Sequence, residues 1–142
     1  SLYMTPRTQG HLVATWLALE DVTDDAGPLR YYPGSHELEQ YRFSDGSWHA
    51  IDAEMPRWHD DVRAQVDRRG LRPERLLAKR GDLFIWHAHL LHGGCEIRDP
   101  ARTRKSIVSH FWSSADVSAL GLSAKPTDGG FWLDRPPQPV PA

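Results

Sequence analysis

The sequence predicts one all-β domain of jelly-roll type, a sandwich or barrel of short strands, with a helical insertion. Short runs of strand-forming residues recur along the chain, and turns rich in glycine and proline separate them. Only one stretch has the apolar spacing typical of a long helix. With 142 residues the chain has the length of a single domain and is long enough to bury a core.

Five stretches are expected to be strands. In residues 11–19 apolar side chains occupy both alternating positions, so both faces of this strand are expected to be covered. The other expected strands are residues 29–32, 76–78, 83–89 and 105–112, and residues 93–103 are expected to form a loop.

The helical insertion is expected from about Pro56 to Arg69. Proline suits the first turn of a helix, and Gly70 suits its end. Trp58, Val62 and Val66 recur every four residues and form a narrow apolar stripe.

The core is therefore expected to comprise residues 1–112, with the helical insertion at about 55–70. Residues 113–142 contain Gly129-Gly130 and Pro136-Pro137 and end in a proline-rich stretch. This C-terminal extension is expected to pack on the core or to be partly disordered.

Composition argues against several classes of protein. The net charge of −2 and the absence of a long run of Lys and Arg argue against a nucleic-acid partner. No apolar run approaches the roughly 20 residues of a membrane span, and the N-terminal residues do not have the pattern of a signal peptide. The single cysteine, Cys95, cannot form an internal disulfide, so a cytoplasmic protein is expected.

The most informative stretch runs from Gly81-Asp82 to Gly93-Gly94 and contains His87, His89 and His92. Imidazole is the commonest protein ligand for transition metals. Side chains alternate along a strand, so His87 and His89 would share a face while His92 would have the opposite parity. All three histidines are therefore not expected to bind one metal.

Three interpretations of these histidines remain open. The favoured one makes His92 a metal ligand at the strand end, where the glycines let backbone and substrate approach. In the second, His87 and His89 form a His-x-His pair as in cupins, although the expected glutamate is missing and Glu96 comes too late. In the third, the histidines are structural and hydrogen-bonded.

Arg104 belongs to the next expected strand and shares one face with Ser106, Val108 and His110. An arginine directed into a barrel is costly unless an anion meets it, and a guanidinium holds a carboxylate in a fixed pose. The alternative is a surface arginine in a charged loop. Together with the histidine stretch, Arg104 favours a metal enzyme that holds an organic acid.

Four stretches carry a family resemblance. They are Trp16-Leu17-Ala18-Leu19-Glu20-Asp21 with Gly27-Pro28-Leu29, then Tyr32-Pro33-Gly34-Ser35-His36, then Gly81-Asp82 through His92-Gly93, and finally Arg104-Lys105-Ser106. In this order and spacing they resemble the phytanoyl-CoA dioxygenase family of Fe(II)- and 2-oxoglutarate-dependent oxygenases. The resemblance spans residues 11–112.

The resemblance implies a cupin-like double-stranded β-helix that holds Fe(II) by two histidines and one carboxylate. His92 would be the distal histidine, and Arg104 would bind the far carboxylate of 2-oxoglutarate with help from Ser106. Trp16 would line the cosubstrate pocket, and His36 would fix its loop rather than bind metal. The partners would be molecular oxygen and a small organic substrate, which the sequence does not identify.

One family motif has no counterpart in the sequence. The family places a His-x-Asp pair on the strand before Trp16, and no such pair lies between Ser1 and Trp16. Ser1-Leu2-Tyr3 resembles the residues that follow that pair, so the pair is expected directly upstream of Ser1 and the β-helix is expected to be incomplete at its N-terminus. His11 is a poor substitute, because no aspartate follows it at the right place.

His59-Asp60-Asp61 has the letters of a His-x-Asp motif but not its position. It follows the Pro-Gly-Ser-His stretch and falls inside the predicted helix. Each helical residue turns by about 100°, so His59 and Asp61 would point in nearly opposite directions and would not chelate one ion.

Three functions are consistent with these observations. The favoured one is a 2-oxoglutarate-dependent dioxygenase, either a hydroxylase or a halogenase. The others are a metal-free fragment or degenerate member that serves as a binding domain, and a cupin-type metal protein using His87 and His89. The oligomeric state is open.

Overall fold

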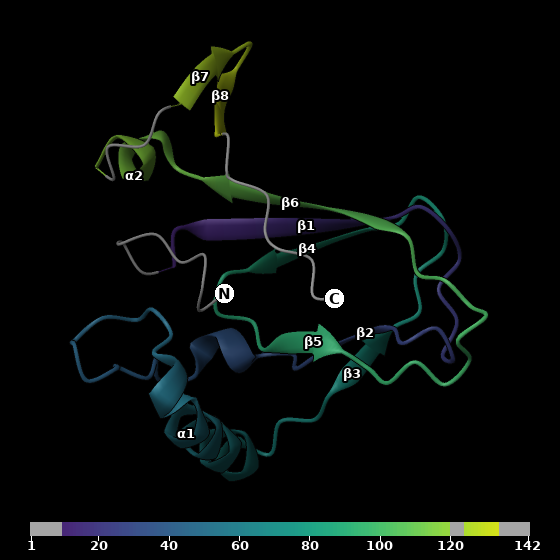
Figure 1. Cartoon of the computed structure of the whole chain (residues 1–142), viewed down its shortest axis with the longest axis horizontal. Helices are drawn as coiled ribbons and strands as arrows, with labels where there is room; N and C mark the ends of the chain where they lie inside the picture. The colour runs from purple at the N-terminus through teal and green to yellow at the C-terminus, as the bar shows by residue number, and fades with distance from the viewer. Residues whose placement is uncertain (1–9, 120–123, 134–142) are drawn as a thin grey trace.

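Two antiparallel three-stranded sheets face each other in the computed structural model, which describes residues 10–119 and 124–133 (Figure 1). The first sheet has the order β4-β1-β6 and the second the order β3-β2-β5. The strands are β1 (Leu12–Ala18), β2 (Leu29–Tyr31), β3 (Glu74–Leu76), β4 (Leu83–His87), β5 (His92–Gly94) and β6 (Ser106–Trp112). The described residues are thus mainly β-structure, as the sequence predicts.

Strand β1 is the centre of the first sheet and provides most of the core. Its buried side chains alternate, and Leu12, Ala14, Trp16 and Ala18 are at most 3% exposed. The opposite face carries Val13, which is 41% exposed. In the part of the chain that the structure describes, the expectation that both faces of β1 are covered is therefore wrong at Val13, while Thr15 and Leu17 on the same outer face are half-buried.

Aromatic rings join the two sheets across the core. Tyr31 of β2 contacts Phe84 of β4 with ring centroids 4.9 Å apart, and His92 of β5 contacts Trp86 of β4 at 5.2 Å. Phe84 stacks on Trp86 at 5.5 Å, so the rings form a continuous row. This row fixes the inner face of the second sheet against that of the first.

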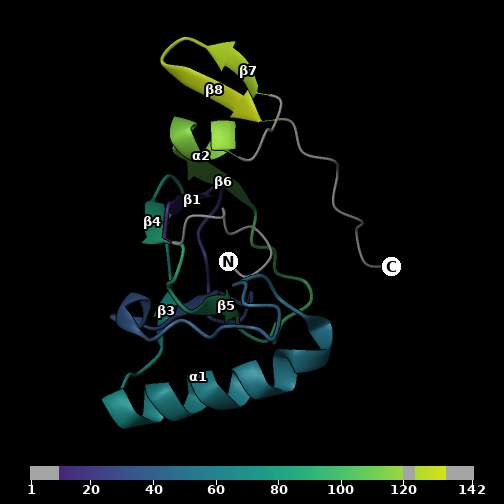
Figure 2. The same cartoon turned by 90° about the vertical axis from the view of Figure 1, so that its left-hand side faces the viewer.

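Helix α1 (Met55–Arg69) confirms the predicted insertion and lies against the second sheet (Figures 1 and 2). It ends at Gly70, whose φ of 63° is in the left-handed region that glycine favours. Gln65 is buried and holds the loop before the helix, because its amide accepts from the Glu39 N–H at 2.9 Å and donates to the Glu39 carbonyl at 3.0 Å. Two single-turn helices, η1 (Ser35–Glu37) and η2 (Asp52–Glu54), lie in the segment between β2 and α1.

The predicted strand over residues 83–89 is too long, and the predicted loop over residues 93–103 starts too early. Strand β4 ends at His87, and the Leu90 N–H donates to the His87 carbonyl at 3.0 Å in a turn. This turn carries the chain to the opposite sheet, where β5 begins at His92. Strand β3 likewise lies two residues earlier than the predicted stretch 76–78.

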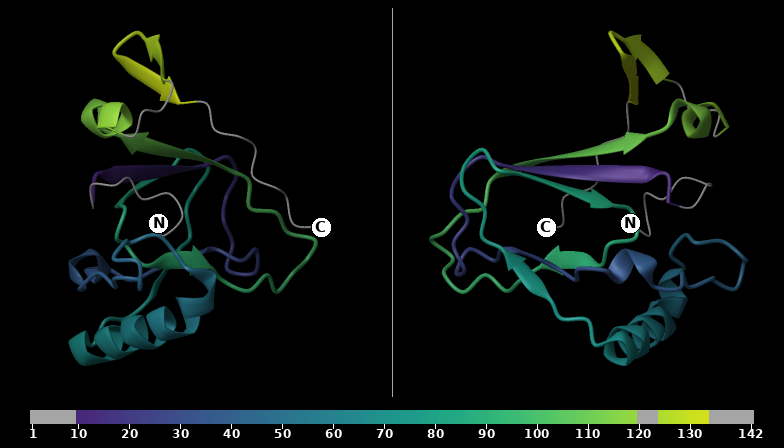
Figure 3. Two further views of the ribbon diagram at one scale, coloured as in Figure 1. Left: turned by 60° about the vertical axis from the view of Figure 1, so that its left-hand side comes forward. Right: turned by 180° about the vertical axis from the view of Figure 1, so that it is seen from behind.

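The C-terminal extension contains helix α2 (Ser114–Ala119) and a hairpin of β7 (Ala124–Thr127) and β8 (Gly130–Leu133), next to β6 (Figure 3). Residues 120–123 and 134–142 lie outside the described residues, so the predicted disorder stays a prediction. His11 holds α2 to the core, since its Nδ1 lies 2.9 Å from Oδ2 of the buried Asp116. Among the described helices, none is long and apolar enough to cross a membrane.

We expect Gly27 to be irreplaceable in the turn before β2. Its φ is +67°, and a Cβ there would lie 2.8 Å from Cγ1 of Ile97 and 2.9 Å from the carbonyl oxygen of Cys95. Gly46 has a similar φ of +77° but no atom within 4 Å of an added Cβ, so it is the matched control. Denaturant unfolding should give a loss of about 1–2 kcal/mol for Gly46→Ala, and about 1–3 kcal/mol more for Gly27→Ala. Equal losses would show that the close approach is unimportant.

Candidate functional site

His92 lies at the start of β5 and faces the first sheet. Its ring packs on Trp86 with centroids 5.2 Å apart. Nδ1 of His92 lies 2.7 Å from the carbonyl oxygen of Leu90, and because a carbonyl only accepts, Nδ1 must carry the proton. In the neutral ring, Nε2 is then left with a free electron pair. A hydrogen bond from one ring nitrogen to a backbone carbonyl is the arrangement that orients metal-binding histidines.

The surroundings of His92 favour the neutral ring. Burial of the imidazole lowers the pKa of His92, and the hydrogen bond to Leu90 opposes this only in part. Part of the residue nevertheless remains exposed to solvent, so the ring is both desolvated and accessible. A histidine must be neutral to bind a metal, so this environment suits a ligand.

Ser35 positions the segment that carries His92, a role the sequence did not suggest. It is 1% exposed, and its Oγ accepts from the Leu91 N–H at 2.8 Å. The Tyr32 N–H donates to the Leu91 carbonyl at 3.0 Å, so the Pro-Gly-Ser-His stretch holds Leu91 on both sides. The expected loop-fixing role of His36 thus belongs chiefly to its neighbour, while the His36 side chain is 46% exposed.

His87 and His89 lie close together, as the cupin-type interpretation requires. Their ring centroids are 4.9 Å apart, and His36 lies 6.1 Å from His87. However, the His89 backbone N–H donates to Nδ1 of His87 at 3.3 Å, which occupies that nitrogen. Within residues 10–119 and 124–133, no group of three His, Cys, Asp or Glu side chains has the geometry of a metal site.

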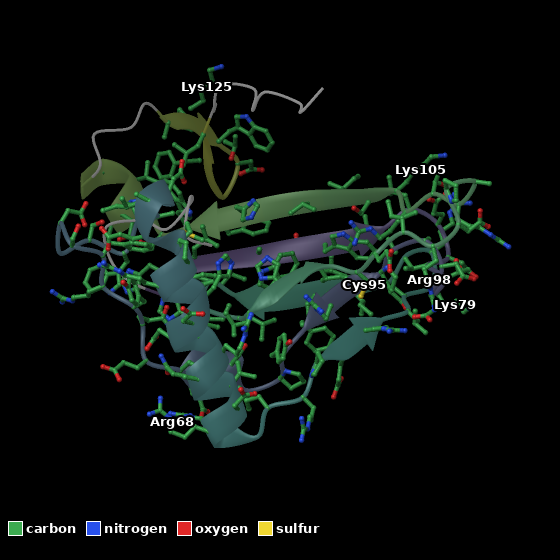
Figure 4. The ribbon with its side chains drawn as sticks, turned by 60° about the horizontal axis from the view of Figure 1, so that its bottom comes forward. Arg68, Lys79, Cys95, Arg98, Lys105 and Lys125 are labelled. Carbon is green, nitrogen blue, oxygen red and sulfur yellow. The ribbon has the colours of Figure 1, made fainter. Side chains whose placement is uncertain are left out.

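Arg104 differs from the other cations at its end of the molecule. Its Nη1 is buried and has no hydrogen-bond partner. Lys79, Arg98 and Lys105, which gather at this end in Figure 4, are exposed and each pair with a carboxylate. A buried guanidinium nitrogen without a partner is costly, so an anionic ligand fits this position well.

The backbone directly after Arg104 is held firmly. The Leu19 N–H donates to the Lys105 carbonyl at 3.0 Å, and the Lys105 N–H donates to Oε1 of Glu20 at 2.6 Å. Ser106 is half-buried and pairs with Ala18, whose side chain lies on the inner face of the first sheet. The site therefore has a fixed frame at the end of β1.

Trp16 lies in the middle of β1 and is 3% exposed. It belongs to the core cluster together with Trp86 and does not line the cavity beside His92. Its expected contact with the cosubstrate stays a prediction.

A cavity of about 240 Å³ lies on the side of His92 toward the loop before α1. This loop and α1 form one side of its wall, which includes Trp48 and Trp58, and the turn between β4 and β5 forms the other. The cavity is lined by Ser35, Leu38, Glu39, Gln40, Tyr41, Trp48, Trp58, Val62, Ala88, His89, Leu90, Leu91 and His92. Trp132, by contrast, lies on the hairpin and is 64% exposed.

The remaining candidate ligands have other roles. His59 and Asp61 lie on α1, as predicted, and Oδ2 of Asp61 accepts from Gln65 Nε2 at 2.8 Å. His11 pairs with Asp116 and is thereby drawn toward α2. Among the described histidines, His92 has the clearest geometry of a metal ligand.

Comparison with known families identifies the family of the chain. The family model of phytanoyl-CoA dioxygenase (PhyH) matches residues 1–106, which include His92, Arg104 and Ser106. The chain belongs to the PhyH family. PhyH proteins are generally dependent on Fe(II) and 2-oxoglutarate, so membership indicates a dioxygenase-type enzyme. No curated protein matches the chain.

His89 should make stability depend on pH. Burial, the largest cause, and the neighbouring imidazole of His87 lower the pKa of His89 to about 4. The unfolded chain has a histidine pKa of about 6.5 and binds the proton first, so the free energy of unfolding falls as pH drops from about 6.5 to about 4.

The measurement compares the melting temperature at about pH 7.5 and about pH 5. The decrease in melting temperature on acidification should be smaller in His89→Gln than in wild type. It should not be abolished, because the lowered pKa of His92 also makes the folded state less stable at low pH. His59→Gln, on the exposed face of α1, is the control and should show the wild-type loss. An unchanged loss in His89→Gln would contradict the burial of this ring.

Proposed function

We propose that the protein is an Fe(II)- and 2-oxoglutarate-dependent dioxygenase, a hydroxylase acting on a small organic substrate. Beyond family membership, the observation that carries the proposal is the pairing of two unusual side chains. His92 has its Nδ1 proton fixed by Leu90, which leaves Nε2 for a metal, and Arg104 has a buried Nη1 without a partner. A metal ligand and a carboxylate anchor are the two protein groups that a keto-acid cosubstrate needs.

The proposed fold is a double-stranded β-helix. Its support is the path of the chain, which alternates between the sheets: β1 lies in the first, β2 and β3 in the second, β4 in the first, β5 in the second and β6 in the first. Strands from distant parts of the sequence then pair, as β1 does with β6. This alternation is typical of a jelly roll.

Each residue has a role that its surroundings suit. His92 would bind Fe(II) through Nε2, and Arg104 would bind the far carboxylate of 2-oxoglutarate with a hydrogen bond from Ser106. Bound iron and 2-oxoglutarate would supply the oxidation of the substrate by molecular oxygen. The protein contributes placement, because the fixed backbone around Arg104 and Leu91 holds both groups before the cosubstrate arrives.

Two further iron ligands are needed, and they are not found among the described residues. The His-x-Asp pair expected upstream of Ser1 stays a prediction. Trp86 and Leu90, which flank His92, would keep water away from one side of the metal.

Removal of the arginine tests the cosubstrate site. Arg104→Ala should weaken 2-oxoglutarate binding by about 10–100-fold, because a charge-assisted contact is lost. Ser106→Ala should cost less, up to about tenfold. The control is Arg102→Ala, since Arg102 is 60% exposed and pairs with Asp99. Calorimetry gives the affinities, and an unchanged affinity in Arg104→Ala would overturn the assignment.

Removal of the histidine tests the metal site in the full-length protein. Iron analysis should find stoichiometric metal in wild type and in His59→Ala, and an affinity at least about 100-fold weaker in His92→Ala, since even the loss of an outer partner costs about 10–100-fold. Loss in the double variant His87→Ala/His89→Ala but not in His92→Ala would favour the cupin-type site. Iron-free wild-type protein would favour a binding domain instead.

A further inference from the structure

We propose that the cavity beside His92 binds a compact, largely apolar substrate that carries no negative charge. This inference rests on the proposed function for the reaction that follows binding, but apart from His92 the cavity is lined by residues that neither the iron site nor the cosubstrate site uses. The wall, the charge and the size of the cavity each support it.

Two tryptophans and a tyrosine give the cavity its aromatic wall. Trp48 comes from the loop before α1, and the guanidinium of Arg42 lies 4.7 Å from its ring centroid. Arg42 does not line the cavity, so it fixes the indole from outside. Trp58 and Val62 come from α1, whose apolar stripe therefore faces the cavity. Rigid aromatic surfaces of this kind favour flat or hydrocarbon groups.

The described lining of the cavity offers no cationic side chain to pair with an anion. No Lys or Arg belongs to its lining in the described part of the chain, and Glu39 brings a carboxylate. An anionic group would enter an apolar cavity unpaired, which is costly, whereas a cation would meet Glu39.

Lys79 and Lys105 lie at the other end of β1 from the cavity. The Ala88 N–H bonds to the Leu12 carbonyl at 2.9 Å, which places the cavity side at the start of β1. The Gly81 N–H bonds to the Ala18 carbonyl at 2.8 Å, and the Leu19 N–H bonds to the Lys105 carbonyl, which places Lys79 and Lys105 at its end, as Figure 4 shows. Anion binding and substrate binding are therefore separated along one strand.

The size of the cavity limits which part of a substrate it can hold. A volume of about 240 Å³ is below the roughly 300–1,000 Å³ of common ligand pockets. An acyl-CoA, with its nucleotide and phosphates, would not fit, and any such part would have to lie outside the cavity.

Three probes with the same naphthalene ring test whether the cavity rejects a negative charge. 1-Naphthalenemethanol is neutral, 1-naphthylmethylammonium is a cation and 1-naphthoate is an anion. Calorimetry without iron or 2-oxoglutarate should find that the neutral and cationic probes bind, and that naphthoate binds at least about tenfold more weakly, since its charge stays unpaired. Because a carboxylate can also bind at Arg104, all titrations are repeated in Arg104→Ala. Equal or tighter binding of naphthoate in that variant would overturn the inference.

Variants locate the binding. Trp58→Ala and Trp48→Ala should each weaken the neutral probe by about tenfold, because an aromatic wall is lost, while Trp58→Phe should retain most of the affinity. Trp132→Ala on the hairpin should bind as wild type does. Glu39→Gln should reduce the preference for the cation by about two- to threefold, since Glu39 is exposed and screened.

These outcomes separate the two proposals. Failure of the neutral probe to bind, or binding that is indifferent to Trp48→Ala and Trp58→Ala in folded variants, would overturn the cavity inference alone. Loss of iron and 2-oxoglutarate binding with retained probe binding would overturn only the oxygenase assignment.

Discussion

The row of aromatic rings between the two sheets is the contact on which the rest of the structure depends. Trp86 and Phe84 come from one sheet, and His92 and Tyr31 come from the other. His92 is therefore a member of the row that joins the sheets as well as the candidate metal ligand. Its ring cannot shift without loosening the contact between the sheets, which keeps the imidazole in one orientation before a metal binds.

The turn between β4 and β5 supplies the backbone groups that orient His92. It is short, so its backbone groups must be satisfied locally, and Ser35 and Tyr32 supply the partners for Leu91 while His87 supplies one for Leu90. The carbonyl of Leu90 is then free to accept a hydrogen bond from Nδ1–H of His92. A serine far along the chain thus holds the backbone between the carbonyl of Leu90 and the histidine that bonds to it.

Local sequence patterns predicted the end of α1 and the centres of three strands, because these depend on residues that are close together in the chain. The helix ended at Gly70 as expected, because a left-handed residue is needed there and glycine provides it. The centres of β1, β4 and β6 were also predicted from strand propensity. The sequence did not predict that the chain leaves the first sheet after His87 and enters the second at His92. One long strand, and a shorter strand followed by a turn into the other sheet, can have the same apolar composition. The roles of Ser35 and the unpaired nitrogen of Arg104 were beyond reach of the sequence alone, since they depend on contacts with residues that are distant along the chain.

The order of groups along β1 explains how one small domain can accept two ligands of opposite character. An acid cosubstrate needs a cation, whereas an apolar substrate needs a surface from which charge is excluded. Arg104 and the paired cations lie beyond Ala18, and the cavity lies beside Ala88, which bonds to Leu12 at the other end of the strand. His92, in contact with Trp86 opposite Ala14, lies between them. The length of the strand therefore separates Arg104 from the aromatic wall, and His92 is the candidate metal ligand that lines the cavity.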